Sequence, residues 1–375
     1  MAIGPDWRRS AGAGDGDTVE RVDHEECDTV AFDSNGQPVI PDGVRTLDVL
    51  GRERTQRAGV VRKTIDTSLQ AERKPEWLKV KASFGENFTD LKRLMGDLEL
   101  NTVCEQARCP NIYECWEMRE ATFLIGGEDC TRRCGFCQIK TGKPAAYDRD
   151  EPRRVAEAVT HLGLRFVVVT MVARDDLDDK GAWLIAETIR QVRATTPDVG
   201  IEVLPSDFGY GHEPAVGARA LEQVVATPPD VFAFNLETCR RLFREIRPSF
   251  DYDRGLEFLS LARERFPSTT AIKSNIIAGM GETDDEIIET MTDIRRAGVQ
   301  LLTIGQYLQP SAQHLHLDRY VTPESFARFK AHGEDVLGFD HVESGPMVRS
   351  SYHAGDQAND AGAWSPDAKR LPVLG

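Results

Sequence analysis

The sequence predicts an α/β protein built on a parallel sheet, and two observations support this prediction. Short β-rich runs recur from about residue 120 onward, and helical patterns separate one run from the next. Strands that alternate with helices at this spacing form parallel sheets with right-handed crossovers. The expected strands are 122–127, 165–170, 200–205, 230–235, 271–279 and 299–307. About six such units fall short of the eight of a complete barrel, so the repeat alone leaves a partial barrel and a doubly wound sheet both open.

Helices are expected where apolar residues repeat at helical spacing. After the strand 271–279, Thr283 and Glu286 have the pattern of a capping box, and Gly298 closes the helix. Its apolar face is expected to consist of Ile287, Ile288, Met291 and Ile294. Ahead of the first strand, a short amphipathic helix is expected from the spacing of Leu91, Leu94, Met95 and Leu98.

Composition narrows the class of protein. The formal net charge of -15 argues against a general nucleic-acid binder, which would carry a basic face. The chain offers neither the apolar core of a signal peptide nor an apolar run long enough to span a bilayer, so no membrane partner and a cytoplasmic location are expected. In that reducing compartment, clustered cysteines indicate metal or redox chemistry rather than disulfides.

Three of the 8 cysteines, Cys130, Cys134 and Cys137, follow the first expected strand with the spacing C-x3-C-x2-C. Thiolates at such intervals can hold three corners of one iron–sulfur cube, and barrels and open sheets place their active sites at this end of the strands. No fourth Cys or His lies within the usual spacing, so one position stays open for a substrate or cofactor. A zinc site completed by a distant residue is the alternative.

This segment resembles the cluster motif of the radical S-adenosylmethionine enzymes. The resemblance implies a 4Fe-4S cluster on these three cysteines, with S-adenosylmethionine bound at its open iron. Phe136 matches the aromatic position near the adenine. The fold implied is a partial (β/α)6 TIM-type barrel with N-terminal and C-terminal extensions that carry an auxiliary cluster.

A second trio, Cys104, Cys109 and Cys115, lies in "TVCEQARCPNIYECW", which closely resembles the auxiliary-cluster motif of the lipoyl synthases. Further segments, from "KPEWLK" through "NLET" and "IRPSFDYDR" to "GPMVRSSYHA", extend the likeness over roughly residues 75 to 357. The resemblance implies a second 4Fe-4S cluster whose fourth ligand is the oxygen of Ser351 in "RSSY", with Ser350 as the alternative.

The resemblance also implies an organisation, an activity and partners. Residues 1–70 are expected to be an acidic, largely disordered extension that includes Cys27, followed by an auxiliary-cluster segment (71–119), the barrel (120–340) and a C-terminal segment (341–375). The activity implied is insertion of two sulfur atoms into the octanoyl chain of lipoyl carrier domains, with the auxiliary cluster as sacrificial donor. The carriers implied are the glycine-cleavage H protein and the 2-oxoacid dehydrogenase acyltransferases, and the electron donor a ferredoxin or flavodoxin.

The alternatives are another radical S-adenosylmethionine enzyme that inserts sulfur, a non-catalytic protein with two structural zinc ions, and a partner-binding protein that has lost catalysis. The spacing of the two cysteine trios, and their pairing with "RSSY", favour the lipoyl synthase activity over all three alternatives.

Polar residues at strand ends are candidate contacts for S-adenosylmethionine: Thr170, Asn235, Glu237, Lys273 and Ser274. Two positions depart from the family pattern. Gly135 stands where proline is usual, which should loosen the cysteine loop, and Phe234 stands where histidine is common, which removes a possible hydrogen bond.

Several further features have two readings. Arg174, Asp175 and Asp176 are either a loop ion-pair network or cofactor contacts, and "GMGE" (279–282) is either a turn or a site of close backbone approach. Cys239 is expected to be a small buried hydrophobe. The arginines of "TRRC" and the segment "ARFKAHGE" are possible contacts for an acidic carrier.

Overall fold

The computed structural model describes residues 74–79, 84–118, 120–144 and 148–367. The whole of the expected acidic extension (1–70), with Cys27, lies outside these residues. No helix among the described residues is both long enough and apolar enough to cross a bilayer.

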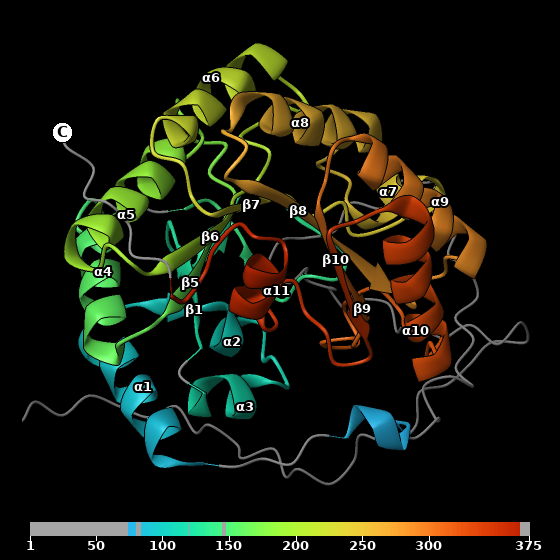
Figure 1. The fold of residues 1–375 in the computed structure, drawn as a ribbon, viewed down its shortest axis with the longest axis horizontal. Helices are drawn as coiled ribbons and strands as arrows, with labels where there is room; N and C mark the ends of the chain where they lie inside the picture. Colours follow the sequence, from blue (N-terminus) through green and yellow to red (C-terminus); the bar gives the residue numbers. More distant parts are fainter. Residues whose placement is uncertain (1–73, 80–83, 119, 145–147, 368–375) are drawn as a thin grey trace, which may run out of the picture. The chain divides into compact units, whose positions relative to one another are not determined.

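The main sheet has eight strands, and its order is β1-β2-β5-β6-β7-β8-β9-β10 (Figure 1). All neighbours are parallel except β1, which pairs antiparallel with β2. The strands are β1 (Asn101–Thr102), β2 (Thr122–Ile125), β5 (Phe166–Met171), β6 (Gly200–Leu204), β7 (Val231–Ala233), β8 (Ala271–Ala278), β9 (Leu301–Gln306) and β10 (His341–Gly345). A two-stranded ladder of β3 (Asp129–Cys130) and β4 (Lys140–Thr141) stands apart.

The strand order decides between the two architectures that the repeat left open. In a doubly wound sheet the order reverses at a switch point, whereas here each parallel strand lies beside the next one in sequence. Six strand–helix units, starting at β2 and β5 through β9, are followed by one further parallel strand, β10. The fold is therefore the expected partial (β/α)6 barrel.

The helices follow the strands and line the outer side of the sheet (Figure 1). They are α4 (Glu151–Leu162), α5 (Ala182–Thr195), α6 (Pro214–Val225), α7 (Arg240–Ile246), α8 (Tyr252–Arg265), α9 (Asp284–Arg296) and α10 (Pro323–Ala331), which continues as a π-helical turn (His332–Leu337). All six strands expected from the sequence are present within two residues of their predicted bounds, whereas β1, β10 and the short ladder were not predicted.

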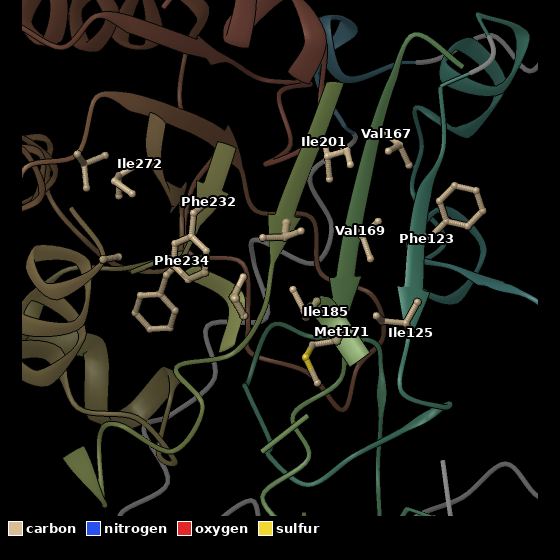
Figure 2. Close-up of a cluster of buried hydrophobic side chains, with 14 of the residues drawn as sticks. Phe123, Ile125, Val167, Val169, Met171, Ile185, Ile201, Phe232, Phe234 and Ile272 are labelled. Atoms are coloured by element: carbon tan, nitrogen blue, oxygen red, sulfur yellow. The ribbon is translucent and has the colours of Figure 1, made fainter. Parts of the chain in front are cut away.

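The core lies between the strands and this helical layer. Figure 2 shows Phe123, Val167 and Val169 on β2 and β5, with Ile185 of α5 among them. All four are fully buried. Each such side chain contributes about 1.5–3 kcal/mol on leaving water, so this layer holds the helices against the strands.

The capping box predicted for α9 is present. The Thr283 hydroxyl accepts from the backbone N–H of Glu286, and the Glu286 carboxylate accepts from the N–H of Thr283. The predicted face is buried except for Ile288, which is half-buried. The other predicted helix is α1 (Glu86–Asp97), which buries Leu91 and Met95 and adds Phe88.

Segments from the two ends of the described chain meet in the gap between β1 and β10 (Figure 1). On the N-terminal side, α2 (Val103–Gln106) and α3 (Ile112–Glu117) lie in this gap, after a short 3-10 turn (Glu76–Leu78) further upstream. On the C-terminal side, α11 (Ala354–Asp360) packs against β5 and β10. The side-chain amide of Asn111 donates to the carbonyl of Met347 at 2.7 Å and joins the two segments.

Candidate active site

The first cysteine trio lies on the loop that leaves β2, as its position in the sequence predicted. The Cys130 sulfur accepts from the backbone N–H groups of Ala173 and Arg132 at 3.3 and 3.5 Å. The carbonyl of Cys137 accepts from the imidazole of His314 at 3.2 Å. Hydrogen bonds from the end of β5 and from the loop after β9 therefore fix both ends of the trio.

An ion-pair network holds the base of this loop. Arg132 is buried, with a bidentate pair to Asp175 at 2.7 and 2.8 Å and a further bond to Asp207 at 2.6 Å. Arg174 pairs with Asp176 at 2.9 Å through two nitrogens and donates to the carbonyl of Gly126. The ion-pair reading of this charged cluster is therefore confirmed, and Arg132, being buried, is not available as a surface contact.

Arg247 lies beside Cys134. Its guanidinium stacks on Phe250, 3.8 Å from the ring centroid, and donates to the carbonyl of Asn235. Burial raises the pKa of the Cys134 thiol, while the charge and a hydrogen bond of Arg247 oppose that rise. An arginine in this position favours the thiolate, which is the form that binds iron.

The second trio is carried by α2, α3 and the turn between them. Burial raises the pKa of Cys104 to about 11, and repulsion from Cys109 adds to the rise. Burial and repulsion from the other two thiols raise the pKa of Cys115 well above its usual value. The three thiols line one pocket, and burial favours the neutral form of Cys104 and Cys115.

The "RSSY" segment reaches this trio from the other end of the chain. Ser351 lines a pocket of about 420 Å³ together with all three thiols of the second trio, and its hydroxyl accepts from Thr122 at 2.9 Å. Arg349 lines the same pocket. Desolvation lowers the pKa of Arg349, and negative charge on Cys109 opposes this effect.

A second pocket, of about 450 Å³, connects the two trios, and we call it the shared pocket. Its lining includes Cys137 of the first trio and Cys104 and Cys109 of the second. Ser350 and Ser351 both border it, and of these two serines Ser351 alone also borders the pocket of about 420 Å³.

Of the other predicted contacts, three line the shared pocket: Phe136, Asn235 and Glu237. Glu237 has a positive φ of 75° and accepts from the amide of Asn275 at 2.6 Å. Burial raises the pKa of Glu237, against the charge of Arg247. The side-chain oxygen of Asn235 is buried without a hydrogen-bond partner, so it is free to accept one from a ligand.

The remaining three predicted contacts lie elsewhere. Lys273 is buried with Glu202, and its ammonium donates to both carboxylate oxygens at 2.9 and 3.1 Å. The hydroxyl of Thr170 donates to the carbonyl of Leu204, and that of Ser274 accepts from the N–H of Leu236. None of the three lines the shared pocket.

The departures from the family pattern have structural explanations. The Gly135 N–H donates to the carbonyl of Ile246 at 2.8 Å, and the Gly135 carbonyl accepts from Leu315 at 2.9 Å, so two hydrogen bonds restrain the loop that glycine was expected to loosen. Phe234 is buried against Phe250 and Phe258 and does not line the shared pocket.

Two smaller predictions are resolved. Cys239 is buried in an apolar cluster with Leu242 and Tyr307, as expected. The "GMGE" segment is a turn, because the Glu282 carboxylate accepts from the backbone N–H groups of Gly279 and Met280.

The donor set fits iron–sulfur clusters. Each trio offers three free thiols, and an arginine lies near a thiol of each. In a cluster each cysteine binds its own iron, so the sulfurs need not converge on one point. Within the described residues, no group of three or more His, Cys, Asp and Glu side chains is arranged to hold a single metal ion.

Comparison with known proteins agrees with this site. A model of the radical SAM superfamily matches residues 124–294, and one of the N-terminal domain of lipoyl synthase matches residues 41–109. The chain is 54% identical over 284 residues to the lipoyl synthase of Kineococcus radiotolerans, covering 76% of this chain and 82% of that protein. It is 53% identical over 284 residues to those of Mycobacterium avium and Nocardia farcinica, covering 76% of this chain and 89% and 78% of those proteins.

A partial barrel with a cysteine trio after its first parallel strand, matched by the superfamily model, is a radical S-adenosylmethionine enzyme. That class carries a 4Fe-4S cluster and uses S-adenosylmethionine. At this identity over this length, the chain belongs to the lipoyl synthase family. The non-catalytic alternatives and the other sulfur-inserting enzymes are therefore not retained.

Proposed function

We propose that the chain inserts two sulfur atoms into the octanoyl chain of an octanoylated lipoyl carrier domain. One 4Fe-4S cluster would be held by Cys130, Cys134 and Cys137, and a second, auxiliary cluster by the other trio together with Ser351. The observation that supports this proposal is the shared pocket, because its walls contain thiols of both trios. One substrate carbon can be reached from both sides only in such a space.

The C–H bonds of an octanoyl chain offer nothing to acid–base catalysis. When bound, the first cluster and S-adenosylmethionine supply a radical that removes hydrogen, and the second cluster supplies sulfur. The chain's own task is to hold the reacting groups close and to exclude water. Apolar side chains in the shared pocket, such as Ile139, Ile277 and Leu308, suit an alkyl chain.

Three residues of the shared pocket are proposed contacts for S-adenosylmethionine: Phe136, Asn235 and Glu237. Asn235 brings an unpaired acceptor, and Glu237 a carboxylate that Asn275 orients. Phe136 supplies an aromatic ring on the cysteine loop itself. Because Lys273, Ser274 and Thr170 are engaged in the barrel wall, they are left out of this proposal.

We propose the glycine-cleavage H protein and the 2-oxoacid dehydrogenase acyltransferases as carriers, and a ferredoxin or flavodoxin as electron donor. Of the predicted basic contacts, Arg133 is exposed, whereas Arg328 is paired with Asp284 at 2.8 Å. Arg133 is therefore the better candidate to meet an acidic partner.

The test is anaerobic. The reconstituted protein is analysed for iron and sulfide, then incubated with reductant, S-adenosylmethionine and an octanoylated carrier peptide, and mass spectrometry follows the peptide. About eight irons, 5′-deoxyadenosine and a dithiolated peptide are expected. Cys104→Ala with Cys109→Ala and Cys115→Ala should still form 5′-deoxyadenosine without adding sulfur. A wild-type protein that forms 5′-deoxyadenosine but never modifies the peptide would overturn the proposal.

A further inference from the structure

Arg349 lies in a recessed site, and no carboxylate of the part of the chain that the structure describes pairs with it. It borders both pockets and lies near Cys109. Its one hydrogen bond to the protein, at 2.6 Å, goes to the carbonyl of its own neighbour Val348, and no described carboxylate pairs with it. Two buried arginines, Arg132 and Arg174, each pair with aspartate, and a third, Arg247, stacks on Phe250 and donates to the carbonyl of Asn235.

The backbone that carries Arg349 is fixed on three sides. Met347 accepts from Asn111 at 2.7 Å, and Ser351 accepts from Thr122 at 2.9 Å. Between them, the Val348 carbonyl lies so close to Gly305 of β9 that a Cβ there would overlap it. The segment that carries the guanidinium is thus held in place by the fold.

A charge taken out of water is costly unless an opposite charge compensates for it. The three thiols of the second trio and the hydroxyl of Ser351 become anionic as ligands of iron. Four anionic ligands around a 4Fe-4S core of charge +2 leave a net charge of -2. The guanidinium of Arg349 therefore lies beside a site that would carry negative charge once a cluster is bound, and each charge would compensate the other.

We propose that Arg349 is the positioning countercharge of the auxiliary cluster: its guanidinium compensates the negative charge of the cluster-loaded trio and so holds cluster and Ser351 in place. This inference rests on the proposed function only in that the second trio binds a cluster. Arg349 binds no iron and takes part in no bond change.

The test separates charge from hydrogen bonding. Arg349→Lys keeps the charge, whereas Arg349→Gln keeps a donor for the Val348 carbonyl and loses the charge. Both are made in a background in which Cys130, Cys134 and Cys137 are alanine, so that all iron belongs to the second trio. The readouts are the reduction potential of this cluster and the rate at which a chelator removes its iron.

Arg349→Gln is expected to make the potential more negative and to speed iron loss roughly tenfold or more, the usual effect of losing an outer partner of a metal site. Arg349→Lys should stay within about threefold of the parent, by the same measure. Arg265→Gln, at an exposed ion pair with Glu222, is the control for loss of an arginine and should change neither readout.

If Arg349→Gln behaves like the parent while Arg349→Lys loses iron, the guanidinium is a structural donor and the inference is wrong. If neither variant differs from the parent, the countercharge is likewise refuted. A parent that binds no iron on the second trio would instead sink the proposed function, so the two failures are distinguishable.

Discussion

Ser351 and Ser350 are adjacent, yet they occupy different surroundings. Ser351 borders the pocket of about 420 Å³ that contains all three thiols of the second trio, and Ser350 does not. Ser351→Ala is therefore expected to lower the bound iron from about eight to about four per chain and to abolish sulfur insertion, whereas Ser350→Ala should keep both. Iron analysis and carrier-peptide mass spectrometry measure this. Equal losses in the two variants would contradict the assignment.

At Gly135, alanine and proline substitutions are expected to have different effects. Alanine fits, because the nearest atom to a Cβ there is 3.6 Å away, but proline removes the N–H that bonds to Ile246. Gly135→Pro is expected to cost about 1–3 kcal/mol locally and to speed iron loss from the first trio, while Gly135→Ala should be near neutral. Chelator kinetics decide, and a proline variant as slow as wild type would mean that the hydrogen bond is dispensable.

At this scale the sequence located the two cysteine trios, whereas only three of the six predicted cofactor contacts line the shared pocket. Cysteine spacing is local, so both trios could be read directly. Contacts on β8 depend on which side of the strand a residue faces and how deep it lies. The shared pocket takes Asn275 and Ile277, whereas the predicted Ser274 has the opposite parity and Lys273 lies one layer deeper. Arg247 and Arg349 were missed because only tertiary contacts place them.

Among elements, the close crossing of β9 and the C-terminal segment fixes where "RSSY" lies. At Gly305 an added Cβ would overlap the backbone carbonyl of Val348, and backbone cannot rotate away as a side chain can. Gly305→Ala is expected to displace the segment, at about 1–3 kcal/mol, and to remove the iron of the second trio while leaving that of the first. Iron analysis in proteins with and without the cysteines of the first trio distinguishes iron bound at the first trio from iron bound at the second.

Gly96, in the last turn of α1, is the matched control. A Cβ there meets nothing within 4 Å, so Gly96→Ala should leave both clusters intact and raise stability by up to about 1 kcal/mol. If Gly305→Ala retained the full iron content, the crossing would not be what positions Ser351.

The capping box of α9 is pH-dependent. Hydrogen bonds from Arg241 and the N–H of Thr283 lower the pKa of Glu286 to about 2. Because the folded pKa lies below the unfolded value of about 4.3, the stabilisation is complete above that pH and is lost as pH falls toward 2. Glu286→Gln is expected to cost about 0.5–1 kcal/mol at pH 7 and progressively less below pH 4.

Thermal unfolding of the cluster-free protein at pH 7 and at pH 3 measures the difference in stability between wild type and Glu286→Gln. Asp285→Asn, one residue earlier in the same turn, is the control for loss of a carboxylate near the helix dipole. A difference that stays constant between pH 7 and pH 3 would show that the charge of Glu286 is not responsible.

The elements that escaped prediction share one physical reason. β10 has the sequence "HVESG", in which only Val342 is buried, and its partner β9 completes it through backbone hydrogen bonds. α11 is short and polar, and it is stabilised because Ala358 packs against Val231 and Leu301. Neither segment carries a local apolar period, so tertiary contact alone defines them.

For the molecule as a whole, the second trio depends on closure between distant parts of the chain. Three of the ligands proposed for its cluster come from α2, α3 and the turn between them, and the proposed fourth comes from residue 351, more than 230 positions later. The strands expected from the sequence set the barrel, but nothing in the pattern of one segment says that the other will lie beside it. Only the resemblance to lipoyl synthases predicted that meeting.

The barrel interior contains a buried ion pair, Lys273 on β8 with Glu202 on β6, and both side chains are at most 1% exposed. Burial raises the pKa of Glu202, and the Lys273 charge opposes it. Lys273→Met alone leaves an unpaired carboxylate and is expected to cost about 3–5 kcal/mol. Lys273→Met with Glu202→Leu removes both charges and should regain most of that stability, because a buried pair contributes little net energy over apolar side chains.

The same double variant decides between the two roles considered for Lys273. If the lysine only neutralises Glu202, the double variant should recover both its melting temperature and the KM for S-adenosylmethionine. If the lysine binds the cofactor, melting recovers but KM stays high, since no second substitution replaces the ammonium. We expect both to recover, because Lys273 does not line the shared pocket and both of its side-chain hydrogen bonds go to Glu202. A KM for S-adenosylmethionine that stays high in the double variant would show that Lys273 binds the cofactor.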